Sequence, residues 1–91
     1  MKIYKYQLKI TDIQTVSMPK GAEILSAQEQ HGEVCIWALV NPEEHWMIER
    51  TILIVGTGNP IDDDIDLEDY FFVGTVQCLR SAIVWHVFAH V

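Results

Sequence analysis

The chain has 91 residues, of which 49% are hydrophobic and 10% aromatic, and its 6 basic against 13 acidic residues give a formal charge of -7. This composition excludes a disordered chain and predicts one globular domain, residues 1–91. The acidic balance disfavours direct binding to nucleic acid or to an anionic membrane, because both need a basic patch, and it leaves a basic protein partner open.

Residues 2–10 alternate between apolar and polar side chains, with two tyrosines, a leucine and an isoleucine on one side and two lysines on the other. A period of two predicts a strand with one solvated face. Residues 13–19 predict a short second strand that ends at Pro19 and Gly21.

Residues 22–42 contain the strongest hairpin signal of the chain. His31 and Gly32 stand between two apolar runs and resemble the Asn-Gly type of two-residue turn. This turn predicts three facing pairs, namely Gln28 with Cys35, Ser26 with Trp37, and Ile24 with Leu39. Both faces of such a hairpin are largely apolar, so we expect both to be covered, by the rest of the fold or by another chain.

The second half of the chain begins with a polar turn, residues 41–44, which suits the first turn of a short helix. Residues 51–55 predict a strand, and residues 59–70 predict an acidic loop. The chain ends in a second hairpin whose turn is centred on Arg80 and Ser81. Its predicted facing pairs are Thr75 with His86, Val73 with Phe88, and Val76 with Trp85.

The expected fold is all-β, a small antiparallel β-barrel or sandwich of about six strands built from hairpins. A barrel would leave no exposed strand edges. The high apolar content for so small a domain also predicts a homo-oligomer. Cys35 and Cys78 lack closely spaced partner ligands, so we expect reduced thiols in a cytoplasmic protein, without a metal site or cofactor.

Two glycines raise the question of a phosphate-binding loop, because Gly56 in "ILIVGTGNP" and Gly74 in "FFVGTVQ" each follow an apolar run. A phosphate loop needs more glycines and a lysine that leads into a helix. Here no lysine follows, and aspartates stand where a cation would help. The two glycines are therefore predicted to mark bulges, bends or close backbone approach within strands.

The acidic run includes Asp62, Asp63 and Asp64. A calcium loop would need alternating acids, a central glycine and a closing glutamate, and the central glycine is missing. The run therefore predicts a solvated, self-repelling loop, which would contact a basic partner if it has a function.

Histidines and tryptophans supply the remaining candidates. His86 and His90 lie four residues apart on one strand, roughly 13 Å, which is too far for one metal ion. Thr75 opposite His86 predicts a hydrogen-bonded pair, and both would supply polar groups to any pocket there.

The segment "EHWMIER" places Trp46 among charges, a composition enriched at interfaces, while Trp37 and Trp85 are expected in the core. A binding surface would form if Trp46, Arg50 and the acidic loop converge. The candidate residues for ligand or partner binding are Trp46, Arg50, Thr75, His86, Asp62, Asp63 and Asp64.

The segments "KIYKYQLKITD", "MPKGAEIL", "QHGEVCIWALVNP", "VGTGNPI", "GTVQ" and "VWHVF" together resemble a family of small, uncharacterised single-domain proteins encoded by bacteriophages and prophages. The resemblance spans nearly the whole chain, and "WALV", "GTG-P" and "VWHVF" are its most specific elements. It implies a phage context and assigns no catalytic residue.

This resemblance leads to three hypotheses. The first is a phage-encoded, non-enzymatic binding protein that inhibits or modulates a host target, including a defence system. It would bind a host protein through its acidic loop or sequester a small signalling ligand between subunits. The second is an oligomeric structural or assembly module of a phage particle. The third is a small hydrolase that uses Thr75 and His86 with a loop carboxylate.

Overall fold

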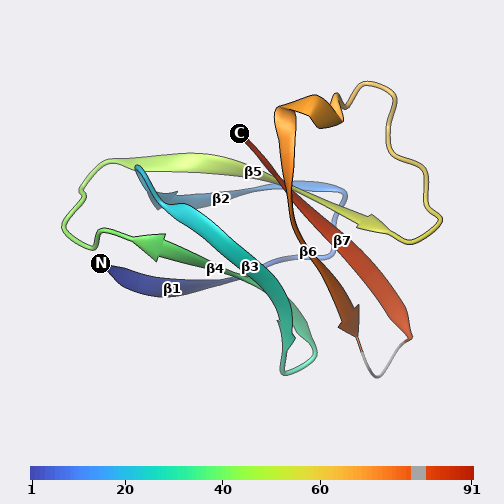
Figure 1. The fold of residues 1–91 in the computed structure, drawn as a ribbon, viewed down its shortest axis with the longest axis horizontal. Helices are drawn as coiled ribbons and strands as arrows, with labels where there is room; N and C mark the ends of the chain where they lie inside the picture. Colours follow the sequence, from blue (N-terminus) through green and yellow to red (C-terminus); the bar gives the residue numbers. More distant parts are fainter. Residues whose placement is uncertain (79–81) are drawn as a thin grey trace.

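The structure is a computed structural model, which describes residues 1–78 and 82–91. In that part of the chain, seven strands and one short 3-10 helix form an open two-sheet sandwich (Figure 1). In chain order the elements are β1 (Lys2–Gln7), β2 (Ile13–Pro19), β3 (Glu23–Gln30), β4 (Glu33–Val40), β5 (Met47–Gly56), η1 (Leu67–Asp69), β6 (Tyr70–Cys78) and β7 (Ile83–His90).

The strands form one sheet of order β1-β4-β3 and a second of order β2-β5-β7-β6, and every neighbouring pair is antiparallel. The prediction of an all-β fold is therefore confirmed. The barrel alternative is wrong, because in the described part of the chain no strand of one sheet pairs with a strand of the other. The described strands number seven rather than about six, and each lies in a segment predicted as a strand or as part of a hairpin. No helix of the described residues is long and apolar enough to cross a membrane.

The core lies between the two sheets. On β4 every second side chain points inward, and Ile36, Ala38 and Val40 are fully buried. Ile52 of β5 and Val87 of β7 meet them from the opposite sheet, also with no exposed surface. This alternation follows from the period of two of a strand, and it assigns the other half of each strand to an outer face.

The β3–β4 hairpin has the predicted turn. His31 and Gly32 have φ angles of 53° and 83°, as a two-residue turn of the Asn-Gly type requires. The facing pairs Gln28–Cys35 and Ser26–Trp37 are confirmed, but the pair of Ile24 with Leu39 is wrong. Leu39 faces Glu23 instead, because an irregularity between Ile24 and Ser26 inserts an extra residue into β3.

Gly32 offers a test of this turn. The Gly32→Ala substitution is expected to lower the free energy of unfolding by about 1 kcal/mol, because a side chain is disfavoured at positive φ. Urea denaturation followed by circular dichroism measures the change. His31→Asn is the control and should leave stability unchanged or higher, since asparagine tolerates this conformation. Equal unfolding midpoints for Gly32→Ala and the wild type would contradict the turn assignment.

The β6–β7 hairpin contains a second bulge. The pairs Thr75–His86 and Val76–Trp85 are confirmed, whereas Phe88 faces Phe72 instead of Val73, because the register shifts between Phe72 and Gly74. The predicted turn at Arg80 and Ser81 lies outside the described residues.

A side chain has little room at Gly56 or at Gly74, the two glycines considered in the sequence. A Cβ atom on Gly74 would lie 3.2 Å from the carbonyl oxygen of Ala27, on the opposite sheet, and one on Gly56 would lie 3.3 Å from the Trp85 ring and 2.7 Å from the Asn59 amide. The prediction of a bulge and of close backbone approach is confirmed at Gly74, beside the register shift between Phe72 and Gly74. At Gly56 the close neighbours are side chains and the β5–β7 register is regular, so neither feature is found there.

Other boundaries differ from the prediction. β5 begins at Met47, four residues earlier than expected, and residues 41–44 form a turn closed by the Glu44 N–H, which donates to the Asn41 carbonyl at 3.0 Å. Trp85 packs against the core as expected. Trp37 does not, because its register position places it on the outer face of β4, where it is half-buried.

Candidate functional site

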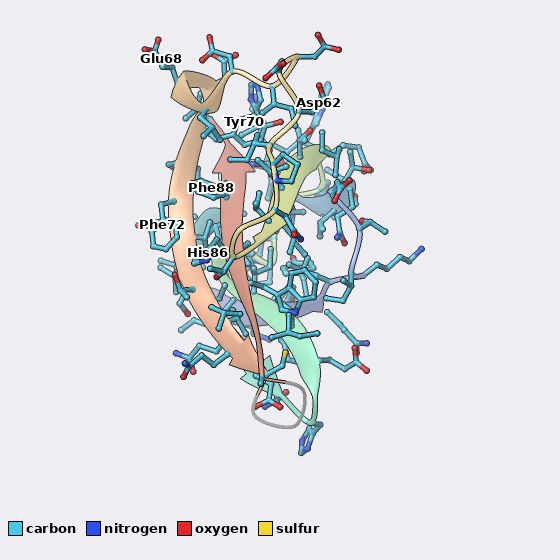
Figure 2. The ribbon with its side chains drawn as sticks, turned by 90° about the vertical axis from the view of Figure 1, so that its right-hand side faces the viewer. Asp62, Glu68, Tyr70, Phe72, His86 and Phe88 are labelled. Atoms are coloured by element: carbon cyan, nitrogen blue, oxygen red, sulfur yellow. The ribbon has the colours of Figure 1, made fainter. Side chains whose placement is uncertain are left out.

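The outer face of β6 and β7 carries a ladder of ring side chains. Tyr70 lies edge-to-face against His90 with ring centroids 5.0 Å apart, and Phe72 lies edge-to-face against Phe88 at 5.4 Å. Phe72 is 56% exposed, so its ring is available to a partner. We call this surface the aromatic face, and the β6–β7 register assigns to it Tyr70, Phe72, Thr75, His86, Phe88 and His90. Figure 2 labels Tyr70, Phe72, His86 and Phe88.

His86 is held at both ring nitrogens. Its Nδ1 lies 3.1 Å from the Thr75 hydroxyl, which confirms the predicted pair, and its Nε2 lies 2.7 Å from the Thr57 hydroxyl. Thr57 follows β5 directly, and its N–H donates to the Val84 carbonyl at 3.2 Å. Threonine hydroxyls both donate and accept, so they satisfy either neutral tautomer of the ring. Thr57 was not among the predicted site residues, although it stands in the "VGTG" segment that contains Gly56.

Thr57 is expected to tether the loop that follows β5 to the aromatic face. The Thr57→Val substitution removes one hydrogen bond, worth about 1 kcal/mol, and should make residues 59–69 roughly fivefold more susceptible to a protease specific for acidic residues. Cleavage rates followed by mass spectrometry test this. Thr15→Val, on the exposed side of β2, should leave the rate unchanged. Equal rates for the two variants would argue against the tether.

Residues 59–69 form the acidic loop, which contains six of the 13 acidic residues: Asp62, Asp63, Asp64, Asp66, Glu68 and Asp69. Two of these six shape the loop. The Asp62 carboxylate accepts from the Asp64 N–H at 2.9 Å, and the Asp66 carboxylate accepts from the Glu68 N–H at 3.0 Å and caps η1. The carboxylates of Asp63 and Asp64 enter no hydrogen bond among the described residues. They are exposed to solvent and open to a partner.

The acidic loop is held against the outer face by apolar contacts. Ile61 and Ile65 line one hollow together with Ile13 and Leu53. Leu53 faces outward between Ile13 and Phe88, yet only 2% of its surface is exposed. The loop thus stands beside the aromatic face in a fixed place, and Asp62 and Glu68 lie at its upper rim in Figure 2.

A shallow groove runs between the start of this loop and β7. It has a volume of about 230 Å³, and Thr57, Asn59, Ile61, His86 and Phe88 are among its lining residues. Pockets for whole small molecules usually measure roughly 300 Å³ or more. The groove therefore suits one or two side chains of a protein segment better than a complete nucleotide-sized ligand.

Trp46 lies far from this surface. It stands just before β5, whereas the acidic loop follows the other end of that strand, about 30 Å away for ten residues (Figure 1). Trp46 is 70% exposed. Its backbone N–H donates to the Glu44 carboxylate at 2.9 Å, and the Lys20 ammonium lies 5.9 Å from the centroid of its ring.

Arg50 serves the fold. Its guanidinium is half-buried and donates to the Ala22 carbonyl at 2.9 Å, which links β5 to the segment before β3. Trp46, Arg50 and the acidic loop therefore do not converge on one surface. Of the seven candidate residues, the structure groups Thr75, His86 and the three aspartates.

The cations with contacts in the structure lie away from the aromatic face. The Lys5 ammonium donates to Gln30, Lys20 lies over Trp46, and Arg50 binds the Ala22 carbonyl. The acidic loop is therefore not neutralised by these side chains, and its negative field extends over the neighbouring rings.

The chemistry of the site gives no support to the hydrolase hypothesis. Both nitrogens of His86 contact threonine hydroxyls, and no carboxylate of the described residues lies at hydrogen-bond distance to orient the ring as a general base. Within the described residues, no group of three or more histidines, cysteines or acids is placed to hold a metal ion.

Comparison with protein families gives a match over residues 1–91 to the model described as "Domain of unknown function (DUF7352)". The chain belongs to the DUF7352 family. Neither the curated proteins nor the solved structures contain a significant match to it. Because the family match covers both sheets, the aromatic face and the acidic loop are parts of the DUF7352 domain itself.

Proposed function

We propose that this DUF7352 protein is a non-enzymatic binding protein whose aromatic face and acidic loop engage a basic segment of a partner protein. One observation carries the proposal: exposed rings, with Phe72 foremost, stand beside a loop with six acidic residues. Exposed apolar surface and concentrated charge of one sign occur together at protein interaction sites.

Arginine and lysine fit this surface in both parts of their side chains. Their aliphatic stems and cationic heads pack on aromatic rings, and the heads are attracted to carboxylates nearby. The carboxylates of Asp63 and Asp64 have no hydrogen-bond partner within residues 1–78 and 82–91, and Phe72 offers a ring. A partner rich in acidic residues would be repelled by the same loop.

The resemblance to phage and prophage proteins supports a host protein as the target. A host protein with a basic site, such as one that binds nucleic acid, would meet a surface of matching charge, and occupation of that site would inhibit or modulate its activity. The small groove gives weaker support to sequestration of a signalling ligand, since a whole nucleotide exceeds its volume.

The binding experiment uses a fluorescent decapeptide of arginine and glycine as a probe, with a glutamate and glycine decapeptide as its counterpart. Fluorescence anisotropy should show binding of the basic peptide only, weakened as salt rises. Phe72→Ala should raise the Kd about tenfold, and Asp63→Asn with Asp64→Asn should raise it several-fold and flatten the salt dependence.

A second pair of acids provides the matched control. Glu43→Gln with Glu49→Gln removes the same charge near the Trp46 end of β5 and should change the Kd by less than about twofold. Equal weakening by both double variants, or an unchanged Kd in Phe72→Ala, would refute the aromatic face as the binding site. Capture from a host lysate with wild type and Phe72→Ala then identifies proteins that depend on this ring.

A further inference from the structure

The groove between the acidic loop and β7 is lined by three large apolar side chains. The β5–β7 register places Val55 and Phe88 on the outer face of neighbouring strands, and Ile61 of the acidic loop joins them. All three side chains are half-buried, so the groove is open to solvent. Its volume of about 230 Å³ admits a large aliphatic side chain.

The polar side chains beside the groove are largely engaged within the chain. Of the three that line it, those of Thr57 and His86 bond to each other at 2.7 Å, and the third is Asn59. The other ring nitrogen of His86 contacts the Thr75 hydroxyl at 3.1 Å. A charged or polar occupant would therefore lose its hydration in exchange for few new hydrogen bonds, which favours an apolar one.

We propose that the groove receives one large aliphatic side chain of the partner segment, which we call the anchor residue, and that a basic residue stands two or three positions from it. This inference rests on the proposed function and specifies the partner further: the segment combines basic residues with one aliphatic residue at a fixed spacing.

The sheet register sets that spacing. Phe88 lines the groove and also faces Phe72 on β6, with ring centroids 5.4 Å apart. The exposed Phe72 ring therefore lies one or two strand spacings from the groove, roughly 5 to 10 Å. An extended segment advances roughly 3.3 Å per residue, so a basic residue that packs on Phe72 stands two or three positions from the anchor residue.

The acidic loop ties the groove to a basic partner. Asp62, Asp63 and Asp64 follow Ile61 directly and are exposed, and Figure 2 shows the start of the loop beside His86 and Phe88. These carboxylates favour basic residues next to the anchor residue and repel acidic ones. The charge beside the groove thus selects an aliphatic side chain within a basic segment over an unrelated apolar molecule.

Three fluorescent peptides test the inference by anisotropy. The parent has four arginines followed by ten glycines, and a leucine replaces either the second or the eighth glycine in the other two. The near leucine should lower the Kd about fivefold relative to the parent, because it reaches the groove while the arginines contact the aromatic face. The distant leucine should lower it by less than about twofold, although the composition is identical.

A variant with a filled groove locates the effect. Val55→Phe adds a ring to the groove and should reduce the gain from the near leucine to less than about twofold. Thr15→Phe adds the same ring to the exposed side of β2 and should keep the fivefold gain. Methyl NMR of the wild type needs no variant, and the resonances of Val55 and Ile61 should shift with the near-leucine peptide more than with the parent.

The outcomes separate this inference from the proposed function. If the parent peptide binds but the near leucine gives no gain, or both leucine positions give the same gain, the groove is not the anchor site and the proposed function stands. An undiminished gain in Val55→Phe would also overturn the inference. Absence of binding by all three peptides would refute the proposed function and the anchor residue together.

Discussion

The Gly74→Val substitution is expected to lower the free energy of unfolding by about 3 kcal/mol and the melting temperature by roughly 15 °C. Gly74 faces inward, where β6 passes directly over β3. Even a Cβ atom would lie 3.2 Å from the Ala27 carbonyl oxygen and 3.5 Å from its Cβ and N atoms. The obstacle is backbone, which cannot rotate away as a side chain can, so the two sheets must separate.

A graded series makes this prediction specific. Gly74→Ala should lower stability by about 1 kcal/mol, because its single methyl group needs a shift of a few tenths of an ångström. Gln77→Val adds a valine to the exposed side of the same strand and should stay within about 0.5 kcal/mol of the wild type. Denaturant melts measure all three variants. A Gly74→Val protein as stable as Gln77→Val would show that the sheets do not approach at this point.

The Leu53→Ala substitution is expected to lower the free energy of unfolding by about 2.5 kcal/mol, although Leu53 points away from the core. Its side chain is 2% exposed because the acidic loop covers it. Truncation removes the support beneath Ile61 and Ile65. Amide hydrogen exchange in residues 62–69 should therefore become faster under native conditions, and the basic probe peptide should bind more weakly.

The Ile36→Ala substitution is the control that distinguishes a loss of overall stability from a loss of order in the acidic loop. Ile36 has no exposed surface and lies in the core, so its truncation should cost about 3 to 4 kcal/mol. In Ile36→Ala, the rate of amide hydrogen exchange in the acidic loop should exceed the wild-type rate only by the contribution of global unfolding. Selective acceleration of the loop in Ile36→Ala but not in Leu53→Ala would contradict the support assigned to Leu53.

Local patterns in the sequence predicted much of this fold. The turn at His31 and Gly32 fixed the pairing of Ser26 with Trp37, and counting from the chain's last hairpin placed Thr75 opposite His86. These contacts follow from the period of two and from turn geometry, both of which act over a few residues. The bulge at Leu25 was missed, because an extra residue in an apolar run leaves no local mark. Gly74 did mark the bulge beside it, but it did not reveal that Phe88 would face Phe72.

The candidate site was predicted only in part, because it depends on distant residues. Thr57 reaches His86 across 29 positions of the sequence, and no periodicity encodes such a contact. Trp46 and the acidic loop flank the same strand, and their closeness in sequence concealed that they stand at its two ends. Phe72 and Phe88 were not predicted as site residues, because their ring contact depends on the bulge that places Phe72 opposite Phe88.

The anchoring of the acidic loop has a consequence for the cost of binding. Ile61 and Ile65 line one hollow with Leu53, and the Asp62 and Asp66 carboxylates accept backbone N–H groups of the loop, so the loop is ordered before a partner arrives. A basic segment that binds there would then lose its own conformational freedom without a second loss from its receptor. Preorganisation of this kind raises affinity without any added contact.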